Sequence, residues 1–425
     1  MDAIGFMKPE CSLSHLGLHQ PGRPQIWVAC LMLLWAHLFV PPALIGDWPG
    51  WLGPQGNNHV KDVVFDPDLS GYRVAWEKQV GLGYASVTLS GDRALTLGHD
   101  GEAQETLYCF HTVTGAELWR HTYPGELIPR MHKGGPNASA MVHQERVYAL
   151  SKDGLLQSLS LESGELIWKV RLTDILNIPV PGWGFASSPI WHHEGLYLAA
   201  GKVARLDPES GTAQWVAEEA YHPGYATPVL FGAGAQKWLA AMDGKGISIR
   251  DPISGRELAR HPFKVQFDMQ ATSPLVMQGE DALFVATNMG SECLDFDGQQ
   301  LVSRWRSREI SHSMNQSILL DGVAYGIDGK QGSSQSRMVA VGLDQGQLLW
   351  AEEGFGYGSS IGINRLALSL TEKGELRVTA LSPEGYNLLS SRKVLSETCW
   401  TTPTFSDGRI FVRNDLGHVV CLQSP

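Results

Sequence analysis

A short phrase recurs along the chain, and its spacing restricts the fold more than any other feature of the sequence. In its clearest copies a turn containing glycine leads into an apolar strand that ends in tryptophan, as in "LESGELIW" (161–168) and "LDPESGTAQW" (206–215). A period of about 45 residues is typical of repeat architectures, in which one small unit is used repeatedly. Eight copies, separated by gaps of 44, 49, 47, 44, 43, 48 and 39 residues, are marked by Gly71, Gly115, Gly164, Gly211, Gly255, Gly298, Gly346 and Gly385.

Each repeat carries the signals of four short antiparallel strands. Residues 184–215 contain an apolar run, a turn, a second run ("GLYLAAG"), a third run, the turn "DPESG" and a last strand. These turn residues suit tight hairpins, because Asp and Ser bond to nearby backbone, Pro fixes φ and Gly adopts the left-handed conformation. No helical pattern of useful length interrupts the repeat.

The two ends of the repeat region predict a closed ring. A four-stranded sheet of this size has two apolar faces that it cannot cover, so such units either stack linearly or close radially. Residues 72–79 ("YRVAWEKQ") supply only a last strand, and residues 401–425 supply only the three strands before one. One blade built from both ends removes exposed edge strands. We therefore predict an all-β fold, an eight-bladed β-propeller of four-stranded antiparallel blades closed by N- and C-terminal strands that share one blade.

The tryptophans at the ends of the last strands are expected to hold neighbouring blades together, rather than to form a ligand platform. Burial of one indole contributes roughly 4 to 6 kcal/mol before conformational entropy is subtracted. The predicted blade-docking residues are Trp76, Trp119, Trp168, Trp215, Trp305 and Trp350.

Residues 1–46 differ from the rest of the chain. The segment 26–46 has no formal charge, and its apolar stretch 26–40 ends at Pro41-Pro42. This stretch is shorter than the roughly 20 residues that a membrane span needs. We predict a cleaved export signal followed by a propeller domain at 47–425, with a retained membrane anchor or a misassigned start as alternatives. Export implies a periplasmic or cell-envelope location, and contact with the membrane only through an uncleaved leader.

Charge and cysteine content exclude several classes of function. With 33 basic and 44 acidic residues the net charge is −11, and no run of Lys or Arg appears, which argues against a nucleic-acid partner. The absence of CxxC and CxxCH motifs excludes a paired-cysteine zinc site and covalent c-type haem. We expect a monomer, and one disulfide remains open among Cys109, Cys293, Cys399 and Cys421.

The residues just before the innermost strand of each blade are expected to crowd one mouth of the central channel. An aromatic ring with a few polar groups is the composition of a small-molecule or peptide site, although the same residues also fill a funnel. The predicted ligand-binding residues are Tyr84, Asn137, Trp183, Phe185, His222, Tyr225, Gln270, His312, Asn315, Tyr357 and Trp400, and the one carboxylate among these segments is Asp268.

Two other clusters contain residue types that can form sites. The neighbouring histidines of "WHHE" (191–194) lie in an expected hairpin turn, where alternate side chains face opposite ways, so no metal site is predicted there. The basic cluster "RMHK" (130–133) precedes a channel-mouth segment and is interpreted as a solvated loop, with contact to an anionic ligand as the alternative.

The repeats resemble a known family. "DPESGTAQW" (207–215), "TGAELW" (114–119) and "SGELIW" (163–168) resemble the tryptophan-docking repeat of the pyrroloquinoline quinone (PQQ) dehydrogenase propellers. Residues 47–425 are similar to the PQQ-like repeat superfamily, which also includes a non-enzymatic outer-membrane β-barrel assembly lipoprotein. The segment "DWPGWLGPQGNNHV" (47–60) is similar to the opening that precedes such propellers. The resemblance implies the fold and leaves the activity open.

For an enzyme, the resemblance implies PQQ lying flat over the channel, Ca²⁺ as Lewis acid and an Asp as base. Asp268 would be that base, and Asn137, Gln270 and Asn315 would offer amide oxygens. No Glu joins them, and one cysteine in "TCW" (398–400) replaces the adjacent pair of the alcohol dehydrogenases. We therefore expect no cofactor and a non-catalytic binding or scaffold module for a protein segment or small ligand at the channel mouth. The alternatives are a PQQ- and Ca²⁺-dependent dehydrogenase of alcohols or sugars, and a purely structural envelope component.

Overall fold

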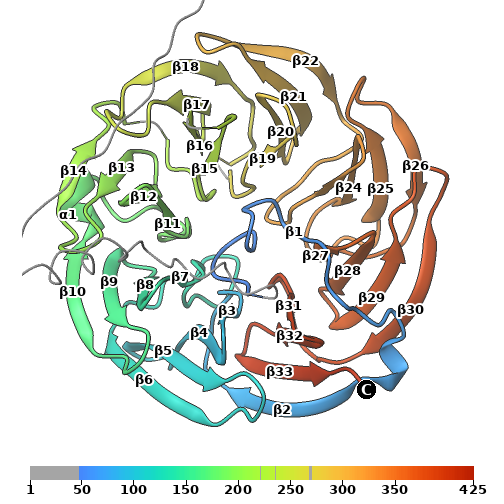
Figure 1. The fold of residues 1–425 in the computed structure, drawn as a ribbon, viewed down its shortest axis with the longest axis horizontal. Coiled ribbons are helices and arrows are strands. Elements are labelled where there is room, and N and C mark those ends of the chain that lie inside the picture. Colours follow the sequence, from blue (N-terminus) through green and yellow to red (C-terminus); the bar gives the residue numbers. More distant parts are fainter. Residues whose placement is uncertain (1–46, 221, 235, 268–269) are drawn as a thin grey trace, which may run out of the picture. The chain divides into compact units, whose positions relative to one another are not determined.

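The computed structural model describes residues 47–220, 222–234, 236–267 and 270–425, and the predicted leader lies outside these ranges. Their strands form eight blades of four antiparallel strands around a central channel, which confirms the predicted eight-bladed propeller (Figure 1). The described residues contain one short α-helix, α1 (Leu172–Leu176), and one 3₁₀ turn, η1 (Leu69–Gly71). None of their helices is long and apolar enough to cross a membrane.

The strands of each blade follow one another from the channel outward. Blades 1 to 4 are β3 (Thr88–Ser90), β4 (Arg93–His99), β5 (Gln104–His111), β6 (Glu117–Pro124); β7 (Met141–His143), β8 (Arg146–Leu150), β9 (Leu155–Ser160), β10 (Leu166–Arg171); β11 (Ile190–His192), β12 (Gly195–Ala199), β13 (Val203–Leu206), β14 (Ala213–Val216); and β15 (Val229–Phe231), β16 (Trp238–Asp243), β17 (Gly246–Arg250), β18 (Glu257–Pro262). Blades 5 to 8 are β19 (Leu275–Val276), β20 (Ala282–Thr287), β21 (Gly290–Phe296), β22 (Leu301–Ser307); β23 (Ile318–Leu320), β24 (Val323–Asp328), β25 (Arg337–Gly342), β26 (Leu348–Glu352); β27 (Gly358–Ile363), β28 (Leu366–Thr371), β29 (Glu375–Ala380), β30 (Asn387–Lys393); and β31 (Thr404–Ser406), β32 (Arg409–Arg413), β33 (His418–Gln423) with β2 (Arg73–Gln79).

Blade 8 closes the ring with strands from the two ends of the described chain. Strand β2 pairs antiparallel with β33, with Trp76 opposite Cys421. This confirms the predicted shared blade. The four cysteines of the propeller are buried and free, so no disulfide assists the closure.

Each docking tryptophan contacts the blade that follows its own. A Cβ atom on Gly115 would lie only 2.5 Å from Trp76 Cγ, and the positive φ of Gly115 (+66°) also favours glycine. The same contact joins Gly346 to Trp305. In five repeats glycine and tryptophan therefore recur together because the glycine receives the indole of the preceding repeat; Gly385, which follows Trp350, has no atom within 4 Å of a Cβ built on it. Each indole Nε1 donates to a backbone oxygen of the next blade: Trp76 to Thr112 (2.9 Å), Trp119 to Leu161 (3.0 Å), Trp168 to Pro208 (2.8 Å), Trp215 to Pro252 (3.1 Å), Trp305 to Leu343 (2.7 Å) and Trp350 to Ser382 (2.8 Å).

Residues 47–62, which we call the strap, cross one end of the central channel (Figure 1). The strap contains β1 (His59–Val60) and connects blades that are distant in the ring. Its contacts are a bridge between Trp48 and Leu89 in blade 1, a hydrogen bond from Val142 N in blade 2 to Pro49 O (2.7 Å), one from Trp51 Nε1 to Ser273 Oγ before blade 5 (3.2 Å), and parallel pairing of β1 with β27 in blade 7.

Replacing Asn58 in the strap with leucine is expected to lower the free energy of unfolding by about 2–4 kcal/mol. Asn58 is buried at a φ of +61°, and its Nδ2 donates to Ser317 O (3.2 Å) and Ser360 O (2.8 Å). Leucine loses both hydrogen bonds and is strained at this φ. Urea unfolding measures the change, with the exposed Gln55→Ala as control; equal effects of the two substitutions would contradict the bridging role of the strap.

Candidate functional site

The two ends of the channel differ in what covers them. The innermost strands run in one direction, so the residues before them lie at one end and their last residues at the other. The strap contacts the middle residues of two of these strands, Leu89 of β3 and Val142 of β7, and pairs with the last two residues of β27, Gly362 and Ile363. The opposite end, beside their N-terminal ends, is called here the proximal mouth, and it is where the predicted site residues belong.

Four aromatic side chains form a continuous arc at the proximal mouth. The rings of Trp400 and Tyr84 are stacked with centroids 5.8 Å apart. Tyr84 meets His132 edge-on at 5.3 Å, and His132 lies 5.6 Å from Trp183. Arg130 extends the series, with its guanidinium carbon 5.7 Å from the centre of the Trp183 ring. We call Trp400, Tyr84, His132 and Trp183 the aromatic arc.

Polar contacts fix the arc in place. Trp400 Nε1 donates to Glu372 Oε2 (3.3 Å), and the Tyr84 hydroxyl accepts from Lys133 N (3.2 Å). The Lys133 ammonium pairs with the buried carboxylate of Asp415 at 3.1 Å. Burial raises the pKa of Tyr84 to about 12, so its hydroxyl stays neutral at physiological pH.

A cavity of about 650 Å³ lies beside the Trp400 end of the arc. Its lining mixes both signs of charge, which suits a polar chain with alternating groups better than a ligand of one charge. The lining residues are Met131, Gln331, Gly332, Glu372, Lys373, Lys393, Ser396, Glu397, Thr398 and Trp400.

A second group lies beneath the arc. Lys152 is fully buried, and its Nζ lies 3.3 Å from Asn137 Oδ1 and 3.4 Å from His132 Nε2. Burial lowers the pKa of Lys152 to about 7 and that of His132 to about 4. Glu105 lies on the far side and accepts from the backbone N–H of Lys152 (3.3 Å).

Six of the predicted ligand-binding residues are buried in the wall of the mouth. Two polar members make contacts inside the wall: His312 Nε2 lies 2.7 Å from Ser317 Oγ, and Asn315 Nδ2 donates to Ile327 O (2.7 Å). Burial lowers the pKa of His312 to about 4. The other four buried members of the set are Phe185, Tyr225, Gln270 and Tyr357.

The structure thus brings Tyr84, Trp183 and Trp400 together, with Asn137 beneath them, and leaves His222 exposed. Asp268 lies outside the described residues. Sequence reasoning had not assigned His132, Lys152 or Glu372 to the site. The cluster "RMHK" was the one signal for His132, whereas "SKDG" (151–154) has the composition of an ordinary turn.

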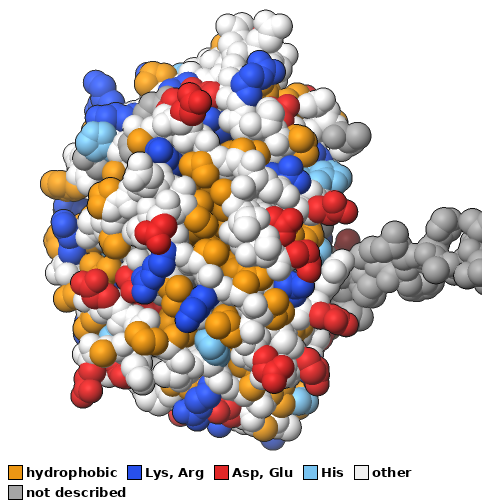
Figure 2. Space-filling model, turned by 90° about the vertical axis from the view of Figure 1, so that its left-hand side faces the viewer, with side chains coloured by type: hydrophobic (Ala, Val, Ile, Leu, Met, Phe, Trp, Pro, Cys, Tyr) orange, Lys and Arg blue, Asp and Glu red, His pale blue; other side chains and the backbone are white. Residues whose placement is uncertain are grey.

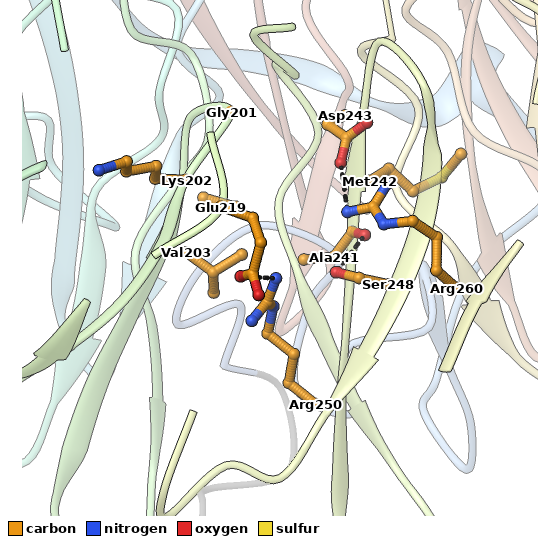
Figure 3. Close-up of a pocket in the computed structure, with 11 residues that line it drawn as sticks. Gly201, Lys202, Val203, Glu219, Ala241, Met242, Asp243, Ser248, Arg250 and Arg260 are labelled. Atoms are coloured by element: carbon orange, nitrogen blue, oxygen red, sulfur yellow. Dashed lines mark hydrogen bonds and ion pairs between the residues drawn. The ribbon is translucent and has the colours of Figure 1, made fainter. Parts of the chain in front are cut away.

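A small polar cavity between blades 3 and 4 is a weaker candidate (Figure 3). Its volume of about 10 Å³ accommodates a single water. Arg250, 2% exposed, donates to Glu219 (3.2 Å), Glu257 (2.7 Å) and Gly255 O (3.0 Å). We interpret this cluster as an ionic contact between blades, since its charges are paired with one another.

The outer side of the ring shows no large area of one charge on the face in Figure 2, where acidic, basic and apolar side chains alternate. Exposed apolar residues such as Leu166 and Ile167 lie on the outermost strand β10. The face drawn in Figure 2 shows no basic stripe of the kind that binds nucleic acid.

The described residues do not fit the PQQ and Ca²⁺ site that the resemblance implies. They contain no group of three or more His, Cys, Asp or Glu side chains arranged to hold a metal. The Asn137 amide oxygen faces the Lys152 amine, and Asn315 is buried with its amide bonded to the blade 6 backbone. Ca²⁺ prefers six to eight oxygen ligands, and no such set converges in the described part of the mouth.

Comparison with known proteins places the chain in a family. A family model described as "Outer membrane protein assembly factor BamB" matches residues 70–218 and 103–352, two overlapping ranges that together span 70–352. A search of curated proteins found no match.

The fold recurs in solved structures. A europium-containing methanol dehydrogenase superposes with a TM-score of 0.68 at 11% identity, covering 88% of this chain and 90% of its own. BamB from Moraxella catarrhalis gives 0.59 at 16% identity, covering 83% and 97%. A quinohemoprotein alcohol dehydrogenase from Comamonas testosteroni gives 0.67 at 10% identity, covering 89% and 80%. At these identities the likeness shows the fold alone.

Proposed function

The chain belongs to the family described as outer membrane protein assembly factor BamB, and from this premise we propose that it is an exported, non-catalytic binding module of the cell envelope. Its partner is an extended protein segment, which binds at the proximal mouth across the aromatic arc and the adjoining cavity. The fold itself does not separate this role from that of a dehydrogenase, because both kinds of protein share it.

The aromatic arc is the observation that carries the proposal. Tyr84, Trp183 and Trp400 are only partly buried, so their rings offer apolar area at a mouth lined with polar groups. Met131, 85% exposed, lies at the rim of the cavity next to Trp400. Aromatic and methionine side chains at the centre of a polar rim are typical of protein interfaces. Side chains of both charges in the cavity offer partners to the polar groups of a bound peptide.

Site-specific photo-crosslinking tests the location of the partner. A photoreactive amino acid at Met131 is expected to crosslink a protein in the producing cells, whereas the same group at Ile253, 61% exposed in the β17–β18 turn of the opposite side, is not. Trp400→Ala and Trp183→Ala are expected to weaken binding by about 2 kcal/mol or more, roughly 30-fold, because aromatic anchors dominate such interfaces. Ile167→Ala on β10 is the matched control. Equal crosslinking at both positions, or no effect of the tryptophan variants, would overturn the proposal.

The enzymatic alternative has a direct test. Calorimetric titration of residues 47–425 with PQQ and excess Ca²⁺ is expected to give no saturable heat, and no dye reduction is expected with alcohols or aldose sugars. Saturable binding together with turnover that is lost in Asp268→Asn would instead establish a small quinoprotein dehydrogenase.

A further inference from the structure

The hydrogen bonds around His132 determine where its proton lies. The backbone N–H of Gly134 donates to His132 Nδ1 (3.0 Å), so Nδ1 is an acceptor and carries no proton. A neutral imidazole then bears its proton on Nε2, the atom that lies 3.4 Å from Lys152 Nζ. The histidine is therefore the donor in this contact.

The lysine must accept that hydrogen bond. A charged ammonium has three donor hydrogens and no acceptor, whereas a neutral amine has a lone pair. Lys152 in its neutral form accepts from His132 Nε2 and still donates to Asn137 Oδ1 at 3.3 Å. An uncharged lysine therefore satisfies both contacts, whereas an ammonium satisfies only the one with Asn137.

The surroundings of Lys152 agree with this assignment. Full burial lowers the pKa of the Lys152 amine to about 7. The negative charge of Glu105 raises this pKa, but by less than burial lowers it. Burial raises the pKa of Glu105 to about 7, although its carboxylate accepts from Lys152 N and from the Tyr123 hydroxyl (3.1 Å). The remaining charged groups nearby are paired elsewhere: Asp153 with Arg171 (2.9 Å) and Lys133 with Asp415 (3.1 Å).

A proton on Lys152 would break the arrangement. The Lys152–His132 contact would then join two donors, unless His132 moved its own proton to Nδ1 and lost the bond from Gly134. Either change loosens loop 130–134 at His132, which lies between Tyr84 and Trp183 in the aromatic arc, while the contacts of Lys133 with the Tyr84 hydroxyl and Asp415 remain.

We propose that Lys152 is a proton-operated latch, which holds loop 130–134 and the aromatic arc in place while it is neutral and releases them when it is protonated. The latch regulates the same mouth that the proposed function uses, so its consequence for partner binding rests on that function. The lysine determines the direction of the pH dependence. Because Lys152 is neutral at high pH and protonated at low pH, the arc is ordered above about pH 7 and loosened below it. His132 does not contribute at mildly acidic pH, because its pKa is lowered to about 4.

Hydrogen exchange measured by mass spectrometry on the whole chain tests the latch without any partner. After correction for intrinsic exchange rates, protection of the peptide covering 130–135 is expected to fall about tenfold between about pH 8.5 and about pH 5.5. Lys152→Met should remove most of the fall in protection, leaving only the contribution of Glu105, whose pKa burial also raises to about 7. Lys169→Met, at an exposed lysine on β10 of the same blade, should keep the wild-type response.

Two further variants keep the test decisive. His132→Phe preserves a ring in the arc but has no nitrogen to contact Lys152, and should abolish the response even where Lys152→Met fails to fold. Glu105→Gln removes the charge that favours the ammonium, so it should move the midpoint to lower pH. Protection that is equal at both pH values in the wild type, or a response that persists in His132→Phe, would overturn the latch. Crosslinking at Met131 is measured separately, so the latch can fail while the proposed function stands, and the reverse.

Discussion

Replacing Trp76 with alanine is expected to lower the free energy of unfolding by about 3–5 kcal/mol. The indole is 7% exposed, packs on Gly115 of blade 1 and donates from Nε1 to Thr112 O (2.9 Å). Alanine leaves a cavity and removes the hydrogen bond at the same time. Because Trp76 lies on β2, the one strand of blade 8 that comes from the N-terminal side of the chain, the loss also weakens ring closure.

Urea unfolding followed by circular dichroism measures this effect, and Val74→Ala is its control. Val74 lies on the same strand but is 47% exposed, so its truncation should cost less than about 1 kcal/mol. Gly115→Val should approach the effect of Trp76→Ala, because its side chain would collide with the indole and strain a positive φ. If Trp76→Ala and Val74→Ala lowered the free energy of unfolding equally, the docking contact would not stabilise the ring closure.

The propeller was predictable because the residues that define each repeat lie close together in the sequence and recur along the chain. The turn that carries Gly211 and the strand that carries Trp215 lie a few residues apart, and the turn chemistry, strand pattern and indole each recur in register. The weaker copies fit the same logic: the repeat at 251–258 has no tryptophan, and no atom lies within 4 Å of a Cβ built on Gly298, the glycine of the following repeat.

The strap and the site were less predictable because they depend on contacts between distant segments. Asn58 bonds to Ser317 and Ser360, partners that no local pattern in 47–60 indicates. The sequence pattern predicts the positions before the innermost strands as a class, but their burial differs: Tyr84 is half-buried, whereas Tyr357 is 1% exposed. That difference is set by the loops between blades, whose paths the sequence pattern does not specify.

Replacing Arg413 with methionine is the second substitution for which we expect a loss of about 3–5 kcal/mol. Arg413 lies on β32 in blade 8 and is fully buried. Burial lowers its pKa to about 10, so it remains charged at neutral pH. Its guanidinium donates across the joint to blade 1 and the segment before it: to Ala85 O (3.1 Å), Thr96 Oγ1 (2.9 Å), Leu97 O (2.7 Å) and Gly81 O (3.2 Å).

The expected loss of stability in Arg413→Met comes from the buried acceptors that lose their hydrogen-bond donor. Methionine matches the length of the arginine stem, but it leaves the backbone oxygens of Ala85, Leu97 and Gly81 without this donor. Arg413→Lys should cost nearly as much, because a single ammonium cannot reproduce the planar fork. Arg409→Met on the same strand, where the side chain is only partly buried, is the control in urea unfolding.

Arg413 and Trp76 stabilise the same joint between blades 8 and 1, one near the channel and one near the outer edge. Once either contact is lost, the other holds two blades that are already loosened, so the double variant should cost about 1–2 kcal/mol less than the sum of the single ones. Arg413 also bonds to the carbonyl of Ala85, the residue after Tyr84, so Arg413→Met should reduce crosslinking at Met131 whereas Trp76→Ala should not. Additive stabilities and an unchanged crosslink would mean that the joint and the aromatic arc are independent.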